Sequence, residues 1–220
     1  LLHDQYLSNF TRYLLEEISP DGGRVPALSQ LSRELGISVT SLREQMEAAR
    51  ELGLVEARPR TGIRRQVYSF LPAVRQSLAF GITEDPQRFE LFSDLRIHIE
   101  ESYWYEAAEL LTVEDHAKLQ ALVEEAKNKL NNNPPQIPHN EHRYLHLYIY
   151  AKLNNPFVQG LLEAYWDMYE AVGLDVYNDI SYLNKVWDYH HRIVNALEAG
   201  NFQAGFKLLR EHKLLLAQRV

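Results

Sequence analysis

The chain has 220 residues, of which 45% are apolar and 24% charged, and its formal net charge is -7. This composition is typical of a soluble globular protein, and no apolar run approaches the roughly 20 residues that span a bilayer. The absence of cysteine excludes disulfides and thiolate metal sites, and no signal-peptide core is visible in the first residues. We therefore expect a cytoplasmic protein that does not contact membranes, in which any metal is held by His and carboxylate side chains.

The acidic charge is unevenly distributed along the chain. Residues 1–75 contain ten Arg and nine Asp or Glu, whereas residues 76–220 contain thirteen Lys or Arg and twenty-one acids. From Ala57 to Thr83 there are five Arg and no acid. A local basic segment matters more for nucleic-acid binding than the sum over the chain, so the N-terminal third is compatible with a DNA partner.

Three short helices are predicted first. Apolar residues recur at helical spacing over residues 7–18, 28–35 and 42–49. Gly36 is expected to end the second helix, and Ser38 is expected to be the N-cap of the third. Each of these helices is too short to be stable alone, so they are expected to pack together.

A β-hairpin is predicted after the third helix. Residues 54–58 and 64–68 have the character of two short strands, with a tip at residues 60–62. Helix, turn, helix and hairpin in this order predict a winged helix-turn-helix domain over residues 1–70, which places one helix in a DNA major groove and the hairpin beside it. The candidate DNA-binding residues are Ser38, Thr40, Ser41, Arg43, Arg58, Arg60, Gly62, Arg64 and Arg65. An alternative for the four hairpin Arg is a solvated surface turn.

The rest of the chain is predicted to be helical. The pattern weakens over residues 71–85, where we expect a linker. In residues 86–220, Thr112 is expected to cap one helix, and Asn155 followed by Pro156 is expected to open another. No strand-like alternation occurs there, so this second domain is predicted to be an antiparallel bundle of about six helices. The predicted fold is therefore mainly α, with one small β-hairpin.

Three predicted helices of the second domain carry His within their apolar faces. His142 and His146 are spaced i,i+4, while His190 and His212 lie on the apolar faces of the last two helices. Two His at this spacing can both reach one ion at about 2 Å, and imidazole ligands suit Zn, Ni, Cu or Fe. These four His are therefore candidate ligands of a divalent transition metal, with Zn or Ni preferred. The alternative is that each is a hydrogen-bonded core residue.

Several positions carry a family resemblance. In the first domain they are Pro26, Leu31, Gly36, Ser38, Leu42-Arg43-Glu44, Gly53-Leu54-Val55 and Gly62. In the second domain they are Arg96, Glu100, Leu145-His146, Asn155-Pro156, His190, Ile193, Ala196, Gly200 and His212. At these positions nearly the whole chain resembles the GntR family of bacterial transcription regulators, and specifically its FadR-like subgroup with an FCD effector domain.

The resemblance implies a ligand set and an effector. Many FCD domains bind a divalent metal through an Asp, a His four residues later and two further His, so His142 stands here at the Asp position. Loss of that negative ligand makes the site more attractive to an anion, and the resemblance implies a small organic acid as effector, with Arg96 and Glu100 as candidate effector-binding residues. A structural i,i+4 ion pair is the alternative for these two residues. Another alternative is a metal-free sensor of a larger ligand, such as an acyl-CoA.

The DNA-binding part departs from the family pattern at two positions. Ser29 and Val39 stand where the family usually has Arg. A good bidentate contact between Arg and a base is worth about 1 to 3 kcal/mol of discrimination. We therefore expect DNA recognition to depend more on Arg43 and on the hairpin.

The resulting hypothesis is a non-enzymatic, ligand-responsive repressor. We expect a homodimer that binds a DNA operator with two-fold symmetry and responds to a metal and a small carboxylate. Two alternatives come from other classes. One is a helical metallohydrolase, although no inward Glu beside the His residues is evident as a general base. The other is a protein-interaction module with a degenerate winged helix.

Overall fold

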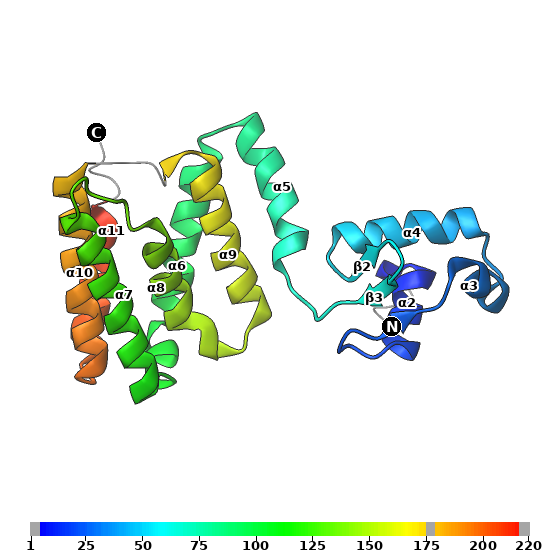
Figure 1. Cartoon of the computed structure of the whole chain (residues 1–220), viewed down its shortest axis with the longest axis horizontal. Coiled ribbons are helices and arrows are strands. Elements are labelled where there is room, and N and C mark those ends of the chain that lie inside the picture. Colours follow the sequence, from blue (N-terminus) through cyan, green and yellow to red (C-terminus); the bar gives the residue numbers. More distant parts are fainter. Residues whose placement is uncertain (1–4, 175–178, 216–220) are drawn as a thin grey trace. The chain divides into compact units, whose positions relative to one another are not determined.

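The computed structural model describes residues 5–174 and 179–215 (Figure 1). Helices predominate, and the chain divides into two compact units with the boundary between Ser77 and Leu78. Each unit is described by itself. In the described part of the chain, no helix is long and apolar enough to cross a membrane.

The first unit contains the three predicted short helices and a small sheet. Ser38 caps the third helix as predicted, because its hydroxyl accepts a hydrogen bond from the backbone N–H of Ser41. Gly36 ends the preceding helix in the left-handed conformation, with φ at 68°, which glycine adopts without steric cost. The elements are α2 (Asn9–Glu17), β1 (Arg24–Val25), α3 (Leu28–Leu35), α4 (Val39–Glu51), β2 (Val55–Arg58) and β3 (Gly62–Arg65).

One core holds this unit together. Phe10, Leu31 and Leu42, from three different helices, are fully buried and belong to the same hydrophobic cluster. Val55 of β2 joins this cluster, so the hairpin is packed against the helices. The three short helices therefore pack together into one small domain, as predicted.

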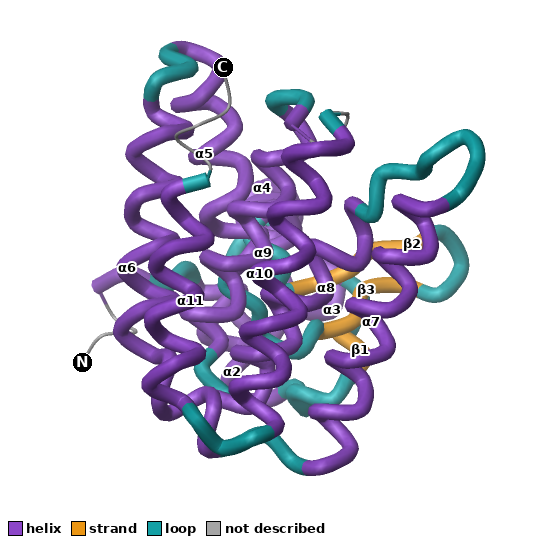
Figure 2. Tube along the Cα trace, turned by 90° about the vertical axis from the view of Figure 1, so that its left-hand side faces the viewer, coloured by secondary structure: helices purple, strands orange, loops and turns teal. Residues whose placement is uncertain are grey.

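The sheet differs from the prediction in two respects. Its antiparallel strands lie side by side in the order β1-β3-β2 (Figure 2), and β1 was not expected. The second hairpin strand is Gly62–Arg65 rather than residues 64–68. Arg60 and Gly62 both have positive φ, which makes the turn tight and lets pairing begin at Gly62 opposite Arg58.

Residues 71–85, expected to be a linker, are mostly helical. Helix α5 (Leu71–Glu84) begins with Pro72 in its first turn, where a missing N–H costs nothing. Ile82 is the one buried residue of this fully described helix, while Phe80 is 73% exposed. A helix without a buried face has no clear apolar periodicity, which explains why the pattern weakened there. The domain limits drawn from the sequence stay a prediction.

The second unit is the predicted helical bundle (Figure 1). Thr112 caps its helix in a reciprocal arrangement with Asp115, and Asn155 caps the helix that begins at Pro156, both as predicted. Helix α10 packs against α7 and α11, and α6 contacts α8, α9 and α11. The helices are α6 (Arg88–Glu109), α7 (Val113–Asn131), α8 (His139–Tyr150), α9 (Pro156–Ala171), α10 (Ile180–Glu198) and α11 (Phe202–Leu214), with a 3-10 turn, η1 (Ala151–Leu153), after α8.

Large aromatic side chains fill the bundle core. Trp104, Trp166 and Trp187 are each at most 2% exposed. The indole N–H of Trp104 donates to the backbone carbonyl of Phe202 at 2.9 Å. Gly205 faces the same indole so closely that a Cβ atom there would lie 2.6 Å from the ring. Helix α11 is therefore seated directly on α6 through a position that has no side chain.

Candidate metal centre and nucleic-acid interface

Four His side chains converge in the core of the second unit. Helix α8 supplies two of them from one face, and α10 and α11 supply one each. One ring nitrogen from each His lies within 4.8 Å of the corresponding atom of every other His. We call His142, His146, His190 and His212 the four-His cluster. The structure thus brings together all four residues singled out from the sequence.

Aromatic rings pack around the four-His cluster. The Trp166 ring lies 4.8 Å from that of His142, and the Trp187 ring lies 4.9 Å from that of His190. His190 and His212 are fully buried, with ring centroids 4.4 Å apart. Burial, together with the neighbouring His and Arg residues, keeps the pKa of both imidazoles well below its usual value. Both rings are therefore neutral at physiological pH and can offer lone pairs to a metal.

The donor set fits a transition metal. Within the residues that the structure describes, His190 Nδ1 and both ring nitrogens of His212 are buried without a hydrogen-bond partner. A buried polar atom left in this way costs about 1–3 kcal/mol, and such atoms are rare in native proteins. Coordination of an ion would satisfy ring nitrogens that the protein itself leaves without a partner. Neutral imidazoles suit Zn, Ni, Cu or Fe better than hard ions such as Ca²⁺.

Arg96 and Glu100 form a buried ion pair beside the four-His cluster. They lie one turn apart on α6, are 3% and 0% exposed, and are 2.9 Å apart between Arg96 Nη2 and Glu100 Oε1. The Arg96 guanidinium also stacks 4.6 Å above the ring of Tyr165. Burial alone would raise the pKa of Glu100, but the charge of Arg96 and the contact with His146 lower it to about 2. The carboxylate is therefore ionised.

The ion pair reaches the four-His cluster through one ring nitrogen. His146 Nδ1 lies 2.9 Å from Arg96 Nη2 and 3.1 Å from Glu100 Oε1. The other ring nitrogen, Nε2, lies 3.2 Å from His190 Nε2. Arg96 and Glu100, the candidate effector-binding residues, thus form the i,i+4 pair that the sequence offered as an alternative. Both residues contact Nδ1 of His146, on the side of the ring opposite the contact with His190.

A narrow opening leads toward the only half-buried member of the four-His cluster, His142. Its volume is about 20 Å³, which is room for about one water molecule. His139 stands on the wall of this opening, stacked on Tyr169 and bonded through Nε2 to Glu170 at 2.9 Å. This small space therefore lies directly beside one member of the four-His cluster.

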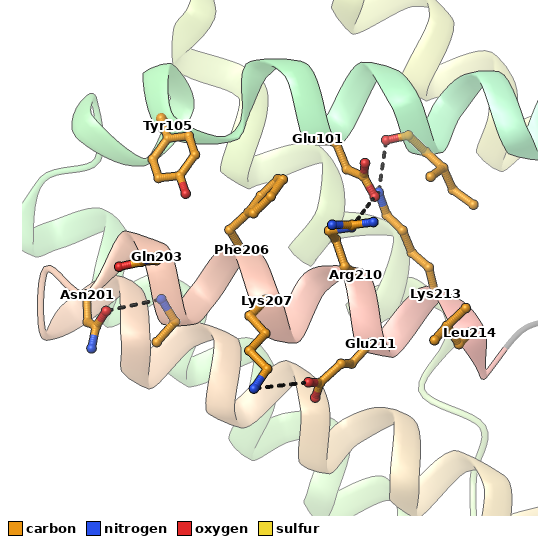
Figure 3. A pocket seen from close by; sticks show the side chains of 12 residues that line it. Glu101, Tyr105, Asn201, Gln203, Phe206, Lys207, Arg210, Glu211, Lys213 and Leu214 are labelled. Carbon is orange, nitrogen blue, oxygen red and sulfur yellow. Dashed lines mark hydrogen bonds and ion pairs between the residues drawn. The ribbon is translucent and has the colours of Figure 1, made fainter.

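A much larger groove of about 1110 Å³ runs between α6 and α11 (Figure 3). Its cations face acids across short distances. Lys213 Nζ lies 3.4 Å from Glu101 and 2.9 Å from the backbone carbonyl of Ile97, and Arg210 lies 3.7 Å from the same Glu101. Lys213 directly follows the cluster residue His212, which points to the other side of α11 and does not line the groove.

The candidate DNA-binding residues occupy one end of α4 and the hairpin. Thr40 and Arg43 are exposed in the first turns of α4. Ser38 is also exposed, but its hydroxyl caps the helix, and the Ser41 hydroxyl accepts from Gln45 at 3.2 Å. Both hydroxyls act as acceptors in these bonds, so their O–H groups can still donate, and Thr40 and Arg43 are the exposed side chains beside them in the first turns of α4.

The hairpin Arg residues are not equivalent. Arg58, Arg60 and Arg64 are exposed, whereas Arg65 is half-buried and donates to the backbone carbonyls of Leu14 and Ile18 at the end of α2. Gly62 at the tip allows the tight turn. Three of the four predicted Arg residues are therefore exposed cations of the wing, which is the hairpin of β2 and β3.

Arg24 is an additional exposed cation that sequence reasoning missed. It lies on β1 directly opposite Arg64 of β3, and its guanidinium lies beside Gly62 at the hairpin tip. No sequence signal marks it, because β1 has only two residues and its partner lies forty residues further along the chain. Pairing of β1 with β3 adds Arg24 to the basic surface of the wing.

A family model and a related protein both match this chain. Residues 91–214 match the model of the FCD domain. A protein of Escherichia coli K12, named as the uncharacterized HTH-type transcriptional regulator YieP, is 27% identical over 201 residues, which are 89% of this chain and 85% of that protein.

Solved structures share the fold. Streptococcus agalactiae GntR aligns over 100% of both chains with a TM-score of 0.72 and 18% identity. Lar, described as controlling the expression of the Listeria monocytogenes agr system, aligns over 96% of this chain and 95% of its own with a TM-score of 0.51 and 14% identity. The predicted fold, a winged helix-turn-helix followed by a helical bundle, is confirmed.

Proposed function

Because the chain belongs to the FCD domain family and is a transcription regulator of the GntR family, we propose that its four-His cluster binds a divalent transition metal that modulates operator binding. One observation carries this proposal. Ligand atoms from three helices lie within 4.8 Å of one another in a buried core, and three of the ring nitrogens have no partner within the described residues. The family assignment places the chain among regulators and not among enzymes, so the metallohydrolase alternative is not pursued.

Zn²⁺ or Ni²⁺ is the ion that the donor set favours, and when bound it supplies a concentrated positive charge and a Lewis-acidic centre. His142, His146, His190 and His212 would hold it. Four neutral imidazoles bring no negative charge, so the occupied site attracts an anion. A small carboxylate is the proposed effector, and the opening beside His142 favours the smallest members of this class.

The exposed cations of the first unit support an operator-binding role. GntR regulators bind DNA operators and usually dimerise, and we propose a homodimeric repressor on a two-fold-symmetric operator. Thr40 and Arg43 would contact the major groove, with Arg58, Arg60 and Arg64 of the wing beside it. Metal or effector changes operator affinity only by binding the DNA-competent and incompetent arrangements with different affinity.

A second candidate keeps the regulator but replaces the effector. The groove between α6 and α11 is large enough for a ligand such as an acyl-CoA, which would bind without metal. Ligand pockets of drug-sized molecules typically measure about 300–1,000 Å³. Pairing of Lys213 and Arg210 with Glu101 argues against this candidate, because an anionic ligand would have to compete with that carboxylate.

The experiment uses the full chain freed of metal with a chelator and then titrated with Zn²⁺ or Ni²⁺. We expect one ion per chain and a change of at least threefold in affinity for DNA fragments from the protein's own promoter region, measured by fluorescence anisotropy. His190→Gln should abolish both effects, and His98→Gln, at an exposed His outside the cluster, should abolish neither. Metal binding that His190→Gln leaves unchanged, or operator affinity that is indifferent to metal, would overturn the proposal. An acyl-CoA effect that persists in His190→Gln would favour the second candidate.

A further inference from the structure

We infer that Glu100, held by Arg96, fixes the tautomer of His146 so that its Nε2 lone pair is offered to the metal. This inference rests on the proposed function, because it concerns an ion in the four-His cluster. Glu100 is a positioning residue in this scheme. It touches His146 and acts on the ion only through that ring.

The starting observation is that one nitrogen has two neighbours with opposite requirements. His146 Nδ1 lies 2.9 Å from Arg96 Nη2, which can only donate a hydrogen bond, and 3.1 Å from the ionised Glu100, which can only accept one. A neutral imidazole nitrogen either carries a proton or has a lone pair. It therefore satisfies one of these neighbours at a time.

Each choice fixes the opposite end of the ring. With a bare Nδ1, Arg96 donates to it, and the proton sits on Nε2 and points at His190 Nε2, 3.2 Å away. With the proton on Nδ1, the ring donates to Glu100, and Nε2 has its lone pair directed at the cluster. The two states differ by the position of one proton on a neutral ring, so no net charge is taken up or lost.

Only the second state can ligate through Nε2, and Glu100 is the group that stabilises it. Metal-bound His rings in proteins usually donate their other N–H to a carboxylate or a carbonyl. Arg96 does not lose its partner in this state, because its Nε lies 3.0 Å and its Nη2 lies 2.9 Å from Glu100 Oε1. An ion entering the four-His cluster therefore selects a hydrogen-bond arrangement whose atoms are already in place.

The charge of Glu100 is already balanced within the protein. A divalent ion held by four neutral imidazoles would leave two positive charges in an aromatic core. Glu100 is 0% exposed and in contact with a cluster ring, and its second oxygen, Oε2, has no hydrogen-bond partner among the residues described. Arg96 balances its negative charge at nearly the same distance from the ring, so the pair brings no net charge to the ion, and Glu100 acts through its hydrogen bond to His146.

The first test needs no variant. Long-range ¹H–¹⁵N NMR spectra of the His rings distinguish the two tautomers, and we expect the Zn²⁺-loaded full chain to show His146 protonated on Nδ1 with a metal-bound Nε2. A Zn²⁺-loaded protein in which His146 carries its proton on Nε2 would overturn the inference while leaving metal binding itself intact. A wild-type chain that binds no Zn²⁺ would instead refute the proposed function, and the inference with it.

The second test measures Zn²⁺ affinity by competition with a chelating dye. Glu100→Leu, which removes the acceptor altogether, should weaken binding about 10- to 100-fold, the usual effect of losing a group that orients a ligand. Since this change leaves Arg96 buried without its partner, the double variant Arg96→Met, Glu100→Leu is measured alongside it and should show the same weakening. Asp115→Asn, at a buried carboxylate of the same unit away from the cluster, should bind Zn²⁺ within twofold of wild type. Wild-type affinity in both Glu100 variants would overturn the inference.

Discussion

Arg65 Nη1 lies 2.8 Å from the backbone carbonyl oxygen of Leu14, and the same guanidinium donates to the carbonyl of Ile18. The last carbonyls of a helix have no partner within the helix, and a cation there is favourable for both hydrogen bonding and the helix dipole. Arg65 therefore fastens the wing to the end of α2. Its neighbour Arg64 is exposed and makes one bond, to Gly22.

Substitution of these two adjacent Arg residues should have different effects, on stability for Arg65 and on DNA binding for Arg64. Arg65→Ala should lower the free energy of unfolding by about 1–2 kcal/mol, because two carbonyls lose their donor. Arg64→Ala should change it by less than about 0.5 kcal/mol, but should weaken DNA binding and reduce the slope of log affinity against log salt by about 1. Urea denaturation and salt-dependent anisotropy measure the two effects. A stable Arg65→Ala protein with a reduced salt slope would show that Arg65 contacts DNA itself.

Substitution of His212 should remove the stabilisation by metal and should not lower the stability of the metal-free protein. The ring is 3% exposed, and neither nitrogen has a hydrogen-bond partner among the described residues, so His212→Leu should leave the metal-free protein as stable as wild type or more stable. Zn²⁺ at 100 times its dissociation constant should stabilise wild type by about 2.7 kcal/mol and the variant not at all. Thermal unfolding with and without Zn²⁺ measures both. A variant that Zn²⁺ still stabilises by the same amount would remove His212 from the ligand set.

Asp115 should make the second unit sensitive to acid. Its carboxylate accepts hydrogen bonds from Lys152, Thr112 and Tyr148, and these hold the pKa of Asp115 well below its usual value. A lowered folded-state pKa gives stability that is complete above the unfolded-state pKa of about 4 and is lost as the pH falls through the folded-state value. Asp115→Asn should cost about 1–3 kcal/mol at pH 7 and flatten the loss of stability below about pH 5. Measurements of the free energy of unfolding at a series of pH values check this prediction. An equally steep loss of stability with falling pH in the variant would contradict it.

Gly205 sets the depth at which α11 sits. A Cβ atom at this position would lie 2.6 Å from the Trp104 ring, and His212 follows two turns later on the same face. Gly205→Ala should therefore cost about 1–3 kcal/mol and weaken Zn²⁺ binding, because α11 must move outward. Gly81→Ala, where the nearest atom would be 3.7 Å away, is the matched control and should be neutral or slightly stabilising. Unchanged Zn²⁺ affinity in a destabilised Gly205→Ala protein would show that the packing of α11 on Trp104 does not control the position of His212.

Features determined by local sequence could be predicted. Ser38, Thr112 and Asn155 mark helix starts because each cap bonds to a backbone N–H two or three residues away. The convergence of the four His residues could also be predicted, since i,i+4 spacing and apolar faces determine which side of a helix turns inward. These patterns require no knowledge of the tertiary partner.

Features determined by distant partners could not be predicted. The two residues of β1 become a strand only because β3 lies beside them, and the direction of Arg65 depends on the end of α2, about fifty residues earlier in the chain. Likewise, Glu100 and His146 are 46 residues apart, and their spacing gives no sign that they touch. Sequence patterns therefore pointed to the four candidate ligands but not to the buried carboxylate beside one of them.

The four-His cluster draws its members from α8, α10 and α11, and α9 lies between them in the chain. An ion that joins His146 to His190 closes the intervening segment into a loop. If α9 opened locally, that segment would have to remain a closed loop, which has less conformational entropy than an open one. Backbone amides of α9 should therefore exchange with deuterium more slowly once the ion is bound, although this helix contributes no ligand to the cluster.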